Sequence, residues 1–229
     1  GGGTMKVGWL EVVIGTVFIT LVLTVIFTRG RSWLEPSFWK VPAIISTIVM
    51  SATLILLTFD SMSKVSPGKG RVPDPTVINK EIGYVRVEER NRMEPIVGKR
   101  DVGLFGKVWT KEEAIELLKK GKLAIQSRNC MDCHTLLGNG AYFAPDLTKA
   151  WLDPRWDAVI KPMVNAQSKE EALKIWLMNS DKYPTSPRKM PNLKLSEDEA
   201  MAIVVYLKWM SAINTNGFPP NFPEVKITE

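Results

Sequence analysis

Two cysteines and one histidine lie within five consecutive residues, in the order Cys130-Met131-Asp132-Cys133-His134. The chain of 229 residues contains no other cysteine and no other histidine. Two thiols three positions apart can each add across a vinyl group of one haem, and the imidazole that follows can then bind the iron. The spacing therefore predicts covalent attachment of a haem through Cys130 and Cys133, with His134 as an axial ligand.

Two other chemistries use closely spaced cysteines. A thioredoxin-like dithiol expects a strand before the motif and a βαβ pattern around it, and neither pattern is visible near Cys130. A structural zinc site requires four ligands, whereas the motif offers three side chains crowded together. Haem attachment remains the prediction.

The second axial position of such a haem needs a ligand other than histidine, because the chain has only one. Methionine is the usual alternative, and ten are present. We predict Met190, which lies between Pro187 and Pro191 just before a helical pattern, and Met163 is the main competitor. Methionine ligation fills the coordination sphere, so it predicts a haem that transfers electrons and leaves no open site for a substrate.

Three helical patterns surround the motif. One begins at a capping box formed by Thr110 and Glu113, another covers residues 169–178, and the last begins at Ser196. In each pattern, apolar residues recur at helical spacing. We therefore predict that residues 108–229 form an all-α, class I-like cytochrome c domain with a single haem.

Two long apolar segments precede this domain. Residues 7–27 are interrupted only by Glu11, and residues 41–59 carry no charge. Both are long enough to cross a bilayer, so we predict that residues 1–60 form a membrane anchor of two transmembrane helices. The first segment is too long for a typical signal peptide. Glu11 either takes part in proton delivery or reaches water or a partner helix about one turn from the interface.

Residues 61–107 are rich in proline, glycine and mixed charges and show no helical period. A short strand over residues 82–87 is compatible with the pattern, but we predict the segment as a periplasmic linker. The net charge of +6 comes mainly from residues 1–107, around the apolar segments. A nucleic-acid-binding protein would concentrate this charge on its folded module, so the pattern favours a lipid bilayer as the partner and argues against nucleic acid.

The stretches that flank the two predicted axial ligands resemble the cytochrome c subunit of bacterial nitric oxide reductase. The first stretch is CMDCHTLLGNGAYFAPDL, over residues 130–147. The others are KMPNLKLS over residues 189–196, YLKWMSAI over residues 206–213 and NTNGFPPN over residues 214–221. The resemblance covers the carboxy-terminal half of the chain, and it is carried by these flanks more than by the generic haem motif.

This resemblance implies a subunit of the bacterial cytoplasmic membrane that takes up single electrons. It would pass them to a large catalytic subunit, which holds haem b and non-haem iron and reduces NO to N2O. No catalytic centre is expected on this chain, because such a centre needs several histidines and the only one is already used. The family also implies a calcium ion at the subunit interface, near the backbone of Gly140 and Tyr142. We expect two membrane crossings, with the haem domain and both termini on the periplasmic side.

Two features depart from the usual family pattern, which has one transmembrane helix and a short connector. The second apolar segment and the long stretch over residues 61–107 resemble features of quinol-oxidising relatives that have lost the haem motif. The expected electron donor is a soluble cytochrome c or cupredoxin, and quinol remains an alternative. The alternatives for function are the cytochrome c subunit of a haem-copper oxygen reductase and a membrane-tethered haem c gas sensor.

Overall fold

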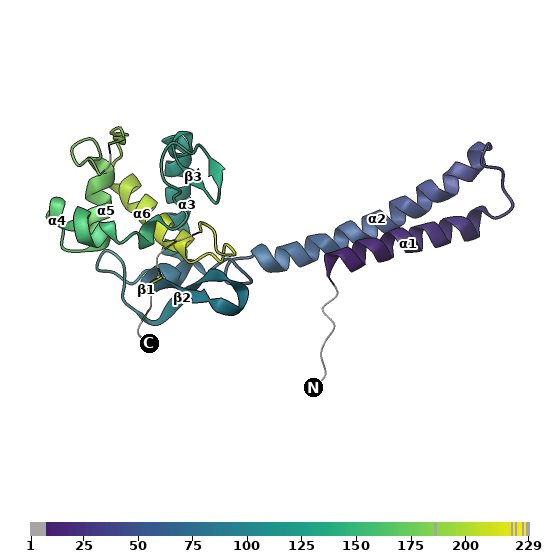
Figure 1. The fold of residues 1–229 in the computed structure, drawn as a ribbon, viewed down its shortest axis with the longest axis horizontal. Helices are drawn as coiled ribbons and strands as arrows, with labels where there is room; N and C mark the ends of the chain where they lie inside the picture. The colour runs from purple at the N-terminus through teal and green to yellow at the C-terminus, as the bar shows by residue number, and fades with distance from the viewer. Residues whose placement is uncertain (1–7, 186, 221, 223, 226, 228–229) are drawn as a thin grey trace. The chain divides into compact units, whose positions relative to one another are not determined.

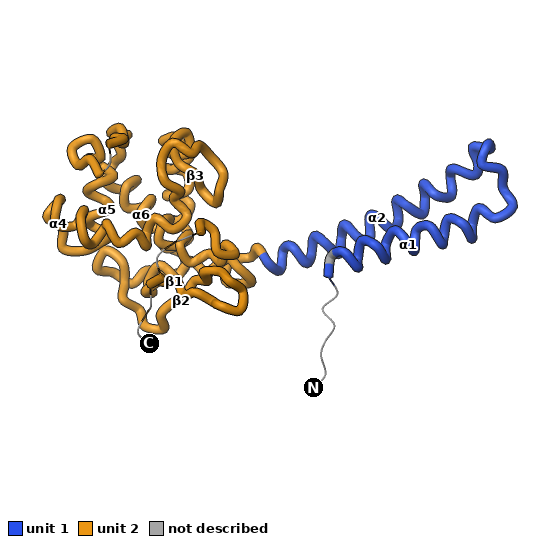
Figure 2. Tube along the Cα trace, in the orientation of Figure 1, with its two compact units in different colours: residues 1–64 blue, residues 65–229 orange. Residues whose placement is uncertain are grey.

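The computed structural model describes residues 8–185, 187–220, 222, 224, 225 and 227. The chain divides into two compact units, one of residues 1–64 and one of residues 65–229 (Figure 2). Each unit has its own arrangement of elements (Figure 1).

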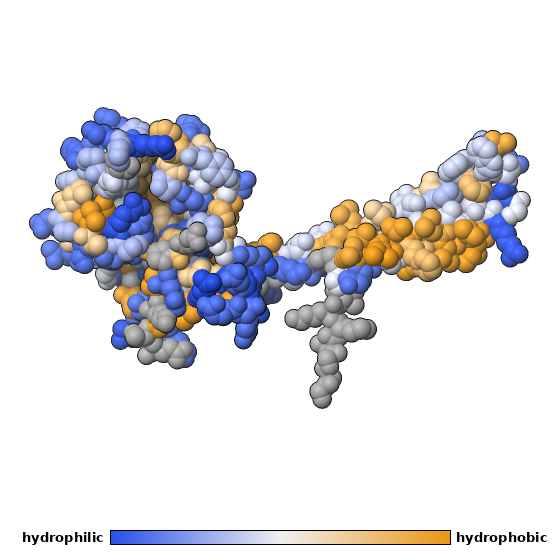
Figure 3. All heavy atoms as spheres, in the orientation of Figure 1, coloured by the Kyte–Doolittle hydropathy of each residue, from blue (hydrophilic) through white to orange (hydrophobic). Residues whose placement is uncertain are grey.

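The first unit is a pair of helices, α1 (Trp9–Thr28) and α2 (Pro36–Val65), joined by a short turn. Residues Leu10–Thr28 and Pro36–Val65 are long and apolar enough to cross a membrane. Their large apolar side chains are mostly exposed, and Figure 3 shows the orange, hydrophobic surface most clearly along α1. Such a surface suits a lipid environment and is costly in water. Helix α2 extends beyond the predicted segment 41–59, and its last turns are polar, with an ion pair between Asp60 and Lys64.

A series of threonines lies along α1. The hydroxyls of Thr16, Thr20, Thr24 and Thr28 each donate to the backbone carbonyl four residues earlier, at distances of 2.6–2.8 Å. These bonds satisfy the hydroxyls within the helix, which allows four polar residues in a segment apolar enough to cross a membrane. Glu11 lies exposed in the first turn of α1.

The second unit is built around three helices: α3 (Lys111–Ser127), α5 (Lys169–Met178) and α6 (Glu197–Ser211). The predicted capping boxes at the starts of α3 and α6 are both present. Helix α6 packs against α3 and α5 and is buried along most of its length. The crossing with α3 is close at Gly121, where an added Cβ would lie 2.1 Å from the carbonyl oxygen of Ala202.

Short elements precede and connect these helices. They are η1 (Pro75–Asn79), η3 (Cys130–Asp132), β3 (Thr135–Leu136), β4 (Asn139–Gly140), η4 (Ala150–Leu152), η5 (Trp156–Ile160) and α4 (Lys161–Met163). The antiparallel pair of β3 and β4 directly follows the predicted haem motif.

The structure differs from the sequence prediction in residues 61–107, which were expected to be a linker. This segment contains an antiparallel hairpin of β1 (Lys80–Val87) and β2 (Arg92–Asp101), joined by η2 (Glu88–Arg90). The hairpin belongs to the second unit because one face is apolar: Ile82 and Tyr84 are buried. The Tyr84 hydroxyl donates to the carbonyl oxygens of Ser211 and Ile213 at the end of α6.

Candidate haem site

A cavity of about 950 Å³ opens in the second unit. It is lined by both cysteines, His134 and Met190, and its walls are mainly apolar, with Ile125, Leu173, Leu177, Leu195, Ile203 and Leu207. Cofactor pockets typically measure ~300–1,000 Å³ and are lined mostly by apolar side chains with a few well-placed polar groups. The size and lining therefore fit a haem, and the site brings together all four residues that the sequence predicts for it.

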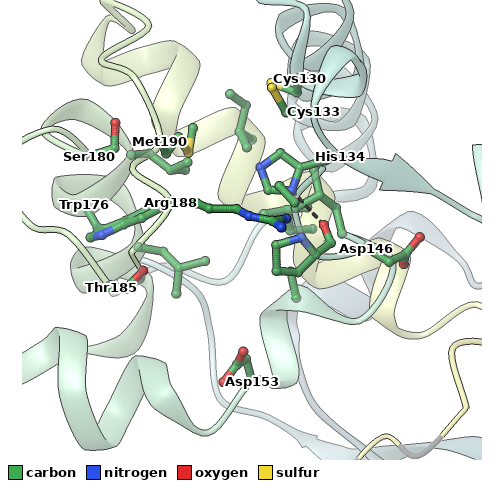
Figure 4. A pocket seen from close by; sticks show the side chains of 18 of the residues that line it. Cys130, Cys133, His134, Asp146, Asp153, Trp176, Ser180, Thr185, Arg188 and Met190 are labelled. Carbon is green, nitrogen blue, oxygen red and sulfur yellow. Dashed lines mark hydrogen bonds between the residues drawn. The ribbon is translucent and has the colours of Figure 1, made fainter. Parts of the chain in front are cut away.

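The two cysteines lie on a single tight turn. Asn129 adopts a left-handed conformation (φ 52°), and the turn that follows is closed by bonds from the backbone N–H groups of Cys133 and His134 to the carbonyl oxygen of Cys130. Both sulfur atoms lie together at one end of the cavity (Figure 4). Burial raises the pKa of the Cys130 thiol. The reactive cysteine of a redox-active dithiol has the opposite shift.

His134 is oriented by a backbone carbonyl. Its Nδ1 lies 2.7 Å from the carbonyl oxygen of Pro145, shown as a dashed line in Figure 4. A carbonyl can only accept, so Nδ1 carries the proton and Nε2 keeps its lone pair for a metal. This fixed tautomer is what an axial iron ligand requires.

The loop that follows His134 is tied back to the motif by its backbone. The N–H groups of Ala141 and Ala144 donate to the carbonyl oxygens of Met131 and Cys133, at 3.0 and 2.8 Å. Gly140 has φ +124°, and a Cβ there would lie 2.3 Å from the carbonyl oxygen of His134. The sequence suggested Gly140 only as a calcium-binding position, and the close approach gives it a second role.

The predicted calcium residues can supply only part of a metal site. Tyr142 is 81% exposed, and its hydroxyl donates to the carbonyl oxygen of Gly138. Among the residues that the structure describes, no group of three or more His, Cys, Asp or Glu could hold a metal ion. Calcium takes six to eight oxygen ligands, so two carbonyls from this loop would need ligands from elsewhere.

Met190 lies on the irregular segment between α5 and α6, across the cavity from His134 (Figure 4). The competitor, Met163, is 39% exposed and is not part of the lining, and Met210 is fully buried in the core. Of the methionines that the structure describes, Met190 is the one that lines the cavity. The geometry therefore favours Met190 for the second axial position.

Two further features of the site were not identified from the sequence. Arg188 spans the two sides of the cavity: its Nη1 donates to the carbonyl oxygen of Phe143 (2.7 Å), and the guanidinium lies 5.0 Å from the centre of the Phe143 ring. Trp156 and Trp176 form an edge-to-face pair in the cavity wall, with ring centres 5.4 Å apart. Hydrogen bonds from their indole nitrogens to the backbone fix both rings in place.

The chain matches the cytochrome c family over residues 118–211. It is 35% identical to the C subunit of nitric oxide reductase from Stutzerimonas stutzeri over 109 residues, which are 48% of this chain and 68% of that protein. It is 38% identical to the corresponding protein of Paracoccus denitrificans over 102 residues, 44% of this chain and 64% of the relative.

The chain thus spans about two thirds of the length of these relatives. The comparisons confirm the resemblance stated from the flanking motifs. They also confirm a cytochrome c domain, whose family binds haem c covalently, and the structure places two apolar helices before it in the chain. The chain belongs to the family of nitric oxide reductase C subunits.

Proposed function

We propose that this chain is the electron-transfer subunit of a membrane nitric oxide reductase. The observation that carries the proposal is the apolar cavity that brings together Cys130, Cys133, His134 and Met190. A haem bound there supplies one-electron redox chemistry. The chain itself contributes attachment, axial ligation and an apolar surrounding that keeps water away, and these factors set a haem potential.

Each residue has a distinct part in this proposal. Cys130 and Cys133 hold the haem covalently at one end of the cavity, and His134 binds the iron through Nε2 while its Nδ1 is held by Pro145. Met190 approaches from the opposite side and closes the coordination sphere. With both axial positions filled, the site suits electron transfer, and chemistry on NO would take place on another subunit.

The partner in this proposal is a large catalytic subunit that holds haem b and non-haem iron and reduces NO to N2O. This chain cannot form such a centre, because its only histidine already lies in the haem motif. The electron donor would be a soluble cytochrome c or cupredoxin, with quinol as the alternative. The apolar helices α1 and α2 would anchor the subunit in the bacterial cytoplasmic membrane, with the haem domain and both termini on the periplasmic side.

We also propose that calcium binds near the carbonyl groups of Gly140 and Tyr142, with its remaining ligands supplied by the catalytic subunit. The exposed position of Tyr142 makes this loop accessible to a partner. Metal analysis of the purified complex before and after mild chelation tests the proposal, and a complex without stoichiometric calcium would contradict it.

The main experiment is to purify the complex that contains this chain and to assay it with NO and with O2. Rapid turnover of NO is expected, and rapid O2 reduction without NO turnover would instead indicate an oxygen reductase.

The axial ligands are tested separately by spectroscopy. We expect a low-spin haem with a methionine-to-iron charge-transfer band in the ferric state. Met190→Ala should abolish this band, whereas Met163→Ala, the matched control, should leave it unchanged. A band that survives in Met190→Ala would refute the assignment. Binding of CO to the reduced, unmodified protein should be slow, and rapid binding would favour a gas sensor.

A further inference from the structure

We propose that Asp146 is a positioning residue for the axial histidine: its carboxylate holds the Pro145 carbonyl against His134 and thereby lowers the reduction potential of the haem. This inference rests on the proposed haem ligation by His134. Asp146 lines the cavity but is neither a predicted ligand nor part of the attachment motif.

The carboxylate of Asp146 accepts two hydrogen bonds, one on each oxygen. The hydroxyl of Thr135 donates to Oδ2 at 2.6 Å, and the backbone N–H of Thr148 donates to Oδ1 at 2.8 Å. Bonds to an ionised carboxylate at such distances are roughly twice as strong as those between neutral groups. Thr135 is 2% exposed and Thr148 is fully buried, so water competes little for these donors.

These bonds belong to a clamp between two short segments. The backbone N–H of Leu147 donates to the carbonyl oxygen of Thr135, and the backbone N–H of Leu137 donates to the hydroxyl of Thr148, both at 2.8 Å. Together with the bond between Thr135 and Asp146, three hydrogen bonds join residues 135–137 to residues 146–148.

The position of the clamp gives it a chemical consequence. Thr135 directly follows His134, and Asp146 directly follows Pro145, so the clamp fixes both ends of the 2.7 Å contact between Nδ1 and the Pro145 oxygen. A short bond from Nδ1–H to an acceptor increases the basicity of the imidazole toward the metal. A more basic ligand stabilises the ferric state over the ferrous state, so an intact clamp lowers the potential.

Charge alone offers a competing explanation, because a carboxylate near the haem also stabilises the ferric state. A substitution of Thr135 distinguishes the two explanations, because this residue carries no charge. Thr135→Val removes the hydroxyl that reaches Asp146, keeps the shape of the side chain and leaves the carboxylate ionised. If positioning matters, this neutral change raises the potential as well.

The experiment uses the full-length chain in detergent, co-purified with its partner, and measures haem potential by redox titration against mediators. We expect Asp146→Asn to lower the ratio of oxidised to reduced haem c about tenfold at a fixed mediator potential. For one electron, this corresponds to a rise in the haem potential of about 59 mV. Thr135→Val should shift it in the same direction. The double variant should fall short of the sum, because both changes act on the same contact between residues 135 and 146.

The matched control for charge is Asp132→Asn, which removes an exposed carboxylate inside the attachment motif. The inference is overturned if Thr135→Val leaves the potential unchanged, whatever the shift in Asp146→Asn; equal shifts in Asp146→Asn and Asp132→Asn would then assign the effect to charge. The NMR signal of the His134 Nδ1 proton gives a second readout, since it should move in Asp146→Asn and Thr135→Val and stay in place in Asp132→Asn.

Failure of this inference is distinguishable from failure of the proposed function. A complex that does not turn over NO but shows the expected shifts rejects the reductase and keeps the positioning role. A haem in which His134 is not an axial ligand rejects both. Asp146→Asn and Thr135→Val are nearly isosteric, so haem incorporation should survive in both variants.

Discussion

The two sides of the haem cavity are held in different ways. On the histidine side, residues 130–148 bond to one another through backbone and buried side chains, and His134 is fixed by Pro145. On the methionine side, Met190 lies on a largely exposed segment. There the hydrogen bonds come from several other segments, such as the bond from the Ser180 hydroxyl to the carbonyl oxygen of Pro191.

The difference indicates how the cavity is organised for its haem. The histidine side forms its geometry locally, so the turn that carries both cysteines and the side chain of His134 are positioned together. The methionine side depends on contacts from other elements. Arg128, the C-cap residue of α3, donates a hydrogen bond to the carbonyl oxygen of Leu193 and forms an ion pair with Glu199 of α6. We expect changes on the histidine side to affect folding and potential, and changes on the methionine side to affect ligand exchange.

The largest effect is expected from Gly140→Ala. The added Cβ would lie 2.3 Å from the carbonyl oxygen of His134, and φ of +124° is unfavourable for alanine. We expect the free energy of unfolding to fall by about 3 kcal/mol or more, with a loss of haem incorporation. Guanidinium unfolding followed by tryptophan fluorescence measures the loss of stability, and haem absorbance of the purified protein measures incorporation.

Gly106→Ala is the control for that change. Gly106 also has a positive φ, of +70°, but no atom lies within 4 Å of the position that a Cβ would take there. It should lose only the conformational term of about 1–2 kcal/mol. Equal losses for the two variants would show that the close approach to His134 contributes nothing.

The next effect concerns Lys149, which links the histidine side to the end of α6. Lys149 is 1% exposed, its ammonium group donates to the carbonyl oxygens of Ser211 and Ile213, and its Nζ lies 4.2 Å from the centre of the Tyr84 ring. Burial lowers the pKa of Lys149 to about 7, from 10.5. Between these two pH values the unfolded chain binds more protons than the folded chain, so stability rises with pH in that window.

Lys149→Met tests this dependence. The unmodified protein should gain stability from pH 7 toward pH 10, with a slope that approaches ~1.4 kcal/mol per pH unit from this residue. The variant should lose that part of the slope. Unfolding curves at several pH values measure it, with Lys122→Met as the control, because Lys122 is exposed on α3. The same slope in both variants would contradict a buried, titrating Lys149.

Local signals in the sequence were enough to predict the cysteines, His134 and Met190, which all line the cavity. The attachment motif and the capping boxes of α3 and α6 each consist of residues within a few positions of one another, so the cysteines, His134 and the helix starts could be predicted. Met190 could be chosen because the prolines on either side of it keep its segment irregular.

The rest depends on contacts between distant residues. Tyr84 pairs with the end of α6 across 127 positions, so the composition of residues 61–107 suggested a linker where the chain forms a hairpin. Arg188 donates a hydrogen bond to the carbonyl oxygen of Phe143, which lies 45 residues earlier in the sequence. Glycine is required at position 140 only because the folded loop brings it against the carbonyl oxygen of His134. Neither hydrophobic periodicity nor a short sequence motif predicts contacts of this kind.

The smallest effect is expected from Arg188→Ala, which removes the contact between the methionine segment and Phe143. Because Arg188 is exposed, its loss should cost at most ~1 kcal/mol, which corresponds to about a fivefold change in an equilibrium. If this contact holds the methionine segment closed, CO should bind the reduced variant about fivefold faster. Lys189→Ala removes the same charge from the neighbouring exposed residue and should leave the rate unchanged. Equal acceleration in both variants would mean that charge, and not the bridge to Phe143, controls access to the iron. A difference between them would show that the contact between Arg188 and Phe143 limits access to the iron on the methionine side.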